Sequence, residues 1–102
     1  MLVAFSIAPS GSSEDNGSVA EAVAAAVRVV RESGLPNETN AMFTNVEGEW
    51  DAVMDVVKRA VDAVAAVSPR VSLVLKADIR PGYDGQITAK VDRIEQVLAR
   101  EA

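Results

Sequence analysis

Two kinds of hydrophobic periodicity divide the chain into seven segments. Short stretches in which apolar residues alternate with small or polar ones predict strands, and longer stretches in which apolar residues recur every three or four positions predict helices. Strands are expected over residues 2–8, 36–41, 43–48 and 71–79. Helices are expected from Ser18 to just before Gly34, over about 50–67 and over about 87–100.

Local signals mark the ends of the first helix. Ser18 and Glu21 have the spacing of a capping box, in which each side chain accepts a free backbone N–H of the first turn. Gly34 is a common helix terminator, and Pro36 cannot continue a helix because it lacks the N–H. The segment 9–17 before this helix carries Glu14 and Asp15, so we expect a solvated loop there and not an anion cradle.

The order β-α-β-β-α-β-α predicts one domain over residues 1–102, of the α+β class. It is the order of a ferredoxin-like βαββαβ sandwich with an additional C-terminal helix. In that fold a pair of helices covers one face of an antiparallel sheet and the other face stays open. The last helix carries a full apolar stripe, so we expect it to dock on the domain or on a neighbouring subunit: Ile87, Val91, Ile94 and Leu98.

The predicted open face mixes apolar, small and charged side chains: Leu2, Ala4, Ser6, Asn45, Glu47, Ser72, Val74, Lys76 and Asp78. A face with this much apolar character is typical of an interface, so we expect a homo-oligomer, a dimer or tetramer. Glu47, Lys76 and Asp78, with Arg80 nearby, attract one another if they lie on neighbouring strands. They form either an ion network that fixes the assembly or the polar floor of a ligand site, and the pattern does not decide between them.

Composition and charge exclude several function classes. The chain has no Cys and no His, which removes thiolate nucleophiles, the Ser-His-Asp triad and the commonest zinc sites. No nucleophile–base pair is evident, so we expect no enzyme, and the carboxylates match no calcium-loop spacing, so we expect no metal. The net charge of −5 disfavours nucleic acid. We expect no membrane span, no signal peptide and a cytoplasmic location.

Several ordered motifs along the chain resemble those of the thiamine-binding protein family. They are Pro9-x-Gly11, Ser18-Val19, Ser33-Gly34-Leu35, Met42-x-Thr44-x-Val46-Glu47-Gly48, and Arg70-Val71 followed by Lys76-Ala-Asp78-Ile-Arg80 and Lys90-Val91. The resemblance runs nearly end to end. It implies a ferredoxin-like subunit that pairs and forms tetramers, binds thiamine or its aminopyrimidine part as a ligand, and uses no further cofactor and no catalysis.

The resemblance also directs attention to the segment from Met42 to Gly48. An aminopyrimidine needs an acceptor for its exocyclic amino group, and Glu47 is the matching carboxylate. Thr44 and Asn45 offer further hydrogen bonds, and the cationic thiazolium suits the ring of Phe43 or Tyr83. Phe43 also narrows a pocket beside Thr44. The full expected ligand-binding set is Glu47, Thr44, Asn45, Ser6, Met42, Phe43 and Tyr83.

Two functions of different classes therefore stand. The first is a non-enzymatic module that binds thiamine or a related pyrimidine. The second is an interaction protein whose open sheet face serves only subunit assembly. The lack of a basic phosphate loop favours unphosphorylated thiamine over its diphosphate in the first case.

Overall fold

The computed structural model describes residues 1–10 and 16–101. The elements follow the expected order: β1 (Leu2–Ser10), α1 (Asn16–Glu32), β2 (Asn37–Thr39), β3 (Thr44–Glu47), α2 (Trp50–Ala65), β4 (Arg70–Asp78) and α3 (Gln86–Glu101). α1 begins two residues before the expected start at Ser18. The capping box that we expected at Ser18, and most of the expected loop 9–17, lie outside the part whose side chains are described.

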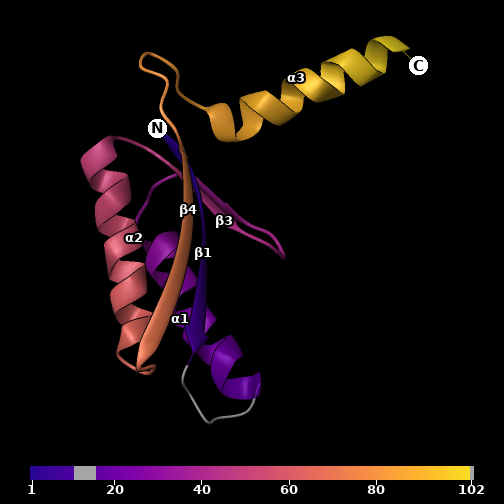
Figure 1. Ribbon diagram of the computed structural model, residues 1–102. Coiled ribbons are helices and arrows are strands. Elements are labelled where there is room, and N and C mark those ends of the chain that lie inside the picture. Colours follow the sequence, from indigo (N-terminus) through magenta and orange to yellow (C-terminus); the bar gives the residue numbers. More distant parts are fainter. Residues whose placement is uncertain (11–15, 102) are drawn as a thin grey trace.

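The strands form one antiparallel sheet in the order β2-β3-β1-β4. α1 and α2 lie together on one face of it, as Figure 1 shows. This is the ferredoxin-like arrangement, so the expected α+β class is confirmed. The register pairs Ala4 with Asn45 on one side and with Lys76 on the other, which places these three side chains in one row on the face away from α1 and α2.

The core lies between the sheet and the two helices, and its side chains are small. β1 and β3 contribute Val3, Phe5 and Val46. α1 contributes Ala22, Ala26 and Val30, and α2 contributes Val53, Val56, Val57, Ala60 and Val64. Because two of the buried side chains of α1 are alanines, this helix packs closely in the core, and there is little room to add volume without moving it.

Burial along α1 and β4 is uneven. In α1 the alanines at positions 22 and 26 are buried, whereas Val19 is 41% exposed and Val23 and Val27 are half-buried at the flank. In β4, Val71 and Leu75 are half-buried against the core, whereas Leu73 is 42% exposed. β4 is an edge strand of the sheet, next to β1.

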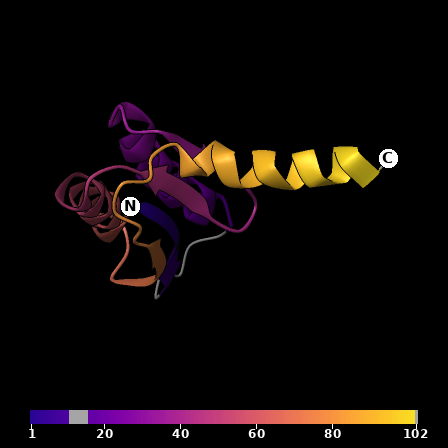
Figure 2. The same cartoon turned by 90° about the horizontal axis from the view of Figure 1, so that it is seen from above.

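α3 leaves the body of the molecule as a projecting arm (Figures 1 and 2). Its apolar stripe stays uncovered within this chain, with Val91 54%, Ile94 58% and Leu98 52% exposed. The arm raises the radius of gyration to 15.6 Å, compared with about 13 Å for a compact domain of this length. The expected docking of α3 on its own domain is therefore found only near the start of the helix and not along the stripe from Val91 onward.

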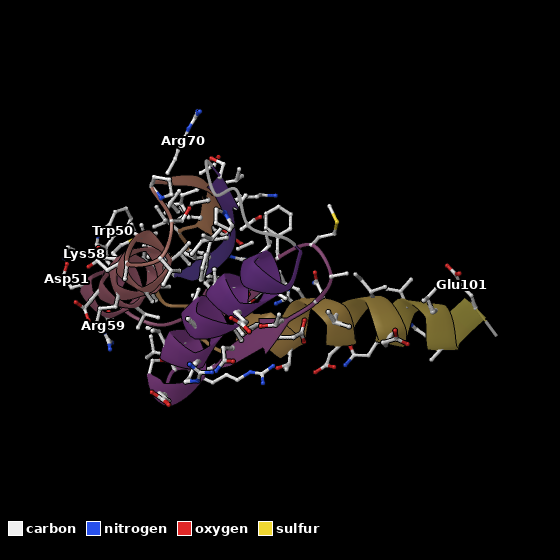
Figure 3. All side chains as sticks on the ribbon, turned by 90° about the horizontal axis from the view of Figure 1, so that it is seen from below. Trp50, Asp51, Lys58, Arg59, Arg70 and Glu101 are labelled. Atoms are coloured by element: carbon white, nitrogen blue, oxygen red, sulfur yellow. The ribbon has the colours of Figure 1, made fainter. Side chains whose placement is uncertain are left out.

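The outer side of α2 is exposed to solvent and carries charged side chains. Figure 3 shows Trp50, Asp51, Lys58 and Arg59 pointing outward from this helix, far from Glu101 at the tip of α3. Asp55 pairs with Arg59 at 2.9 Å, and Lys58 pairs with Asp62 at 3.3 Å. Over the described residues, no helix is long and apolar enough to cross a bilayer.

The close packing of α1 in the core can be tested with two substitutions in the same helix. Ala22→Leu adds volume at a position that is 4% exposed, so we expect it to lower the free energy of unfolding by about 1–3 kcal/mol. Ala24→Leu adds the same volume at an exposed position and should change it by less than about 0.5 kcal/mol. Urea unfolding followed by circular dichroism measures both. Equal effects would contradict the small-residue packing.

Candidate functional site

A pocket of about 230 Å³ lies beside β1, just beyond the point where its pairing with β3 ends. Its walls come from β1, α1 and the turn between β2 and β3: Phe5, Ser6, Ile7, Val23, Ala26, Val27, Thr39, Asn40, Ala41, Met42, Phe43 and Thr44. Four of the expected ligand-binding residues are among them, namely Ser6, Met42, Phe43 and Thr44. The half-buried valines of α1 that miss the core form part of its wall.

The pocket exists because the two strands have different lengths. β3 begins at Thr44, which pairs with Phe5, whereas β1 runs on to Ser10 and pairs there only with β4. In the part of the chain that the structure describes, the β3 side of β1 beyond Phe5 therefore has no strand partner. Its backbone N–H and C=O groups on that side remain free to bond to something other than a strand.

The turn that closes the pocket is held by Asn40. Its Oδ1 accepts the backbone N–H of Met42 at 2.8 Å and of Phe43 at 2.9 Å. These bonds fix Phe43, which is half-buried, while Met42 is 73% exposed. The hydroxyls of Thr39 and Thr44 lie 3.3 Å apart. The pocket thus offers hydroxyl and backbone groups among apolar walls, and none of the described residues that line it is charged.

Glu47 has a different environment from the one expected. It is only 6% exposed, and both of its oxygens bond to the first turn of α3. Oε2 accepts the N–H of Gln86 at 3.0 Å, and Oε1 accepts the N–H of Ile87 at 3.1 Å. The carboxylate therefore satisfies two of the amides that a helix N-terminus leaves free, and it lies at the positive end of the helix dipole.

The remaining expected residues lie elsewhere. Tyr83 has the guanidinium of Arg80 3.6 Å above its ring centre, and beside Glu47 it lines a cavity of only about 10 Å³, too small for any ring. Asn45 lines a third cavity on the open face of the sheet. The expected set is thus divided among three places, because Thr44 points to the helix-covered face whereas Asn45 and Glu47 point away from it.

The charged residues expected to gather on the open face do so in part. Asp78 accepts a hydrogen bond from Lys90 of α3, and this contact is the main reason why the pKa of the Asp78 carboxyl is held below its usual value. Arg80 and Lys76 lower that pKa further. Sequence periodicity gave no reason to place Lys90 here, because the position depends on the direction in which α3 leaves the sheet.

An acidic pocket of about 350 Å³ lies on the other side of Glu47. Glu47, Glu49 and Asp84 line it together with apolar residues such as Leu35 and Pro36. Its size falls within the usual range of small-molecule sites. Among the described residues, no group of three or more side chains is arranged to hold a metal ion.

Comparisons with known sequences give one consistent result. Residues 3–95 match the sequence profile of a family described as thiamine-binding protein. The chain is 55% identical to a UPF0045 protein of Mycobacterium bovis over 101 residues, which cover 98% of this chain and 96% of that protein. A UPF0045 protein of Synechocystis is 35% identical over 82 residues, covering 79% of this chain and 68% of that protein.

Solved structures share the fold. A domain of unknown function from Bacillus cereus superposes with a TM-score of 0.78 at 36% identity, covering 88% of this chain and 85% of that one. A hypothetical protein of Methanocaldococcus jannascii gives 0.80 at 32% identity, covering 92% and 94%. A Thermotoga maritima protein, provisionally described as a thiamine biosynthesis/salvage protein, gives 0.72 at 23% identity, covering 87% and 94%. At that last identity the likeness supports the fold alone.

The cap on α3 can be tested by a conservative change at Glu47. Glu47→Gln keeps the shape but turns one acceptor into a donor that faces a backbone N–H, so we expect a loss of about 1.5–3 kcal/mol in the free energy of unfolding. Glu49→Gln is the matched control, because Glu49 is exposed and its side chain makes no cap bond. Chemical unfolding curves of the two variants give the comparison. Equal stability would show that the Glu47 bonds contribute nothing.

Proposed function

This chain belongs to the thiamine-binding protein family, as its ordered motifs predicted, and from that membership we propose that it is a non-enzymatic module that binds thiamine or its aminopyrimidine part. The observation that carries the proposal is the neutral pocket beside β1, which contains four of the expected residues. Family descriptions name thiamine binding or no function, and the descriptions of the relatives above name no catalytic activity.

The pocket suits the pyrimidine end of the ligand. Its 230 Å³ lies below the roughly 300 Å³ at which sites for larger ligands begin, so it holds one ring. An aminopyrimidine presents a donor next to an acceptor, and the free strand edge beyond Phe5 presents the complementary C=O and N–H groups. The Thr44 hydroxyl adds one further bond.

The thiazolium then lies at the mouth of the pocket, against the ring of Phe43. A cation over an aromatic face contributes about 0.5–2 kcal/mol. None of the described residues of the pocket wall carries a positive charge that would pair with a phosphate, which favours the unphosphorylated form of the ligand. Glu47 is the candidate acceptor at the alternative site. Its bonds to α3 leave lone pairs free, and it borders the acidic pocket, which is the alternative place for a cationic ligand.

We further propose that α3 docks on a second copy of this chain. An isolated helix of this length is marginal in water, and its apolar stripe is exposed, as is Val74 (57%) on the uncovered face of the sheet. Both apolar surfaces are buried if α3 of one copy packs against the uncovered sheet face of a second copy, and the reverse. This assembly is also what the competing interaction-protein function requires.

Calorimetric titration tests the ligand. We expect heat with thiamine and with the free aminopyrimidine, the latter binding about twofold to thirtyfold more weakly because it lacks the cation. Thiamine diphosphate should bind more weakly than thiamine. If none of the compounds binds while the oligomer persists, the interaction protein is the better description.

Substitutions then locate the ligand. Thr44→Val should weaken thiamine binding about twofold to tenfold through loss of a neutral hydrogen bond, and Val27→Phe should abolish it by filling the pocket. Ser72→Ala, on an exposed position of β4, is the control and should bind normally. If Asp84→Asn weakens binding and Thr44→Val does not, the ligand occupies the acidic pocket and the proposed site is wrong.

Light scattering at micromolar concentration tests the assembly. We expect a mass at least twice the 10.7 kDa of the chain. Ile94→Glu places a charge in the apolar stripe and should reduce the mass, whereas Glu95→Gln, next to it on the polar side, should not. A monomeric wild type, or an Ile94→Glu variant of unchanged mass, would overturn the docking of α3 on a second copy.

A further inference from the structure

The open face of the sheet contains a small cavity at the root of α3. It has a volume of about 140 Å³ and is lined by Leu2, Ala4, Asn45, Lys76, Asp78 and Lys90. Ala4 lies in the middle strand with Asn45 and Lys76 as its cross-strand neighbours. Because the Ala4 side chain is only a methyl group, it leaves a depression between the longer side chains of Asn45 and Lys76, which form the walls.

This cavity is locally positive on an acidic protein. The chain carries a net charge of −5, yet the lining holds two ammonium groups and one carboxylate. Lys90 is paired with Asp78. Lys76 makes no ion pair with any side chain that the structure describes, and Arg80 adds a further positive charge near Asp78. The single negative charge of Asp78 is therefore smaller than the combined positive charge of the lysine and arginine side chains around it.

The size of the cavity limits what completes this arrangement. A cavity of about 140 Å³ has room for a small ligand. A tetrahedral oxyanion, with five heavy atoms, is within that size. Ammonium groups bind such an anion as point charges, and the Asn45 amide adds a neutral N–H donor.

We propose that this cavity binds a small tetrahedral oxyanion of the phosphate class between the ammonium groups of Lys76 and Lys90. The bound anion links β4 to α3, because Lys76 belongs to the strand and Lys90 to the helix. It therefore adds a second connection to the one that Glu47 makes with the first turn of α3. The site lies on the opposite face of the sheet from the pocket proposed for the pyrimidine, so either can fail without the other.

The test is a titration of the full-length protein with inorganic phosphate at pH 7.5 and constant ionic strength. Binding is monitored by NMR through the backbone amide resonances of Ala4, Asn45 and Lys76. We expect saturable shifts at these positions. Lys76→Gln and Lys90→Gln should each weaken binding about threefold to tenfold, between the effect of an exposed ion pair and that of a charge-assisted hydrogen bond. A phosphate monoester in the same titration distinguishes the sources: tighter binding than phosphate points to a phosphoryl group on a larger molecule, and equal binding to the free ion.

Two further variants separate a site from a general charge effect. Lys58→Gln removes the same charge from a similar Lys–Asp pair on the far side of the molecule and should leave binding unchanged. Asp78→Asn removes the carboxylate that competes for Lys90 and should tighten binding. Absent shifts, equal weakening by Lys58→Gln, or weaker binding by Asp78→Asn would each overturn the proposal.

Discussion

One buried carboxylate holds the start of the C-terminal helix against the sheet. Glu47 ends β3, and its oxygens hold the N–H groups of Gln86 and Ile87 at the start of α3. The bonds join residues about forty positions apart in the chain, so they orient a helix that makes few other contacts with the domain. The pairing of Lys90 with Asp78, and the cavity that both line, follow from this orientation.

The alternation of side chains along the strands was sufficient to predict the sheet. Positions 2, 4 and 6 face away from α1 and α2 as expected, and the register pairs them with residues of β3 and β4 that were expected on the same face. Periodicity was less informative for α1, where Val and Ala compete for the buried side. Ala22 and Ala26 are buried, whereas Val23 and Val27 are half-buried. Which of these side chains is buried depends on how α1 packs in the folded domain, and single-sequence patterns do not contain that packing.

The expected binding site illustrates a second limit of sequence reasoning. Residues adjacent in a strand point to opposite faces, so the motif from Met42 to Gly48 supplies two faces at once. Thr44 contributes to the pocket between α1 and the sheet, while Asn45 and Glu47 contribute to the open face. Residues of this motif line several separate cavities. Its division into separate roles depends on where β3 begins and on how α3 returns to it, and both are tertiary features.

Because α3 projects from the domain, a small rotation at its start produces a large displacement at its end. Sixteen helical residues span about 24 Å at 1.5 Å per residue, and the contacts with the rest of the chain gather near the root, at Glu47 and Asp78. A rotation of about 10° at that root displaces the tip at Glu101 by about 4 Å. Gly82 and Gly85, with φ of 83° and 63°, form the loop just before the pivot. A change of a few tenths of an ångström at Glu47 is therefore magnified several-fold at the far end of the arm.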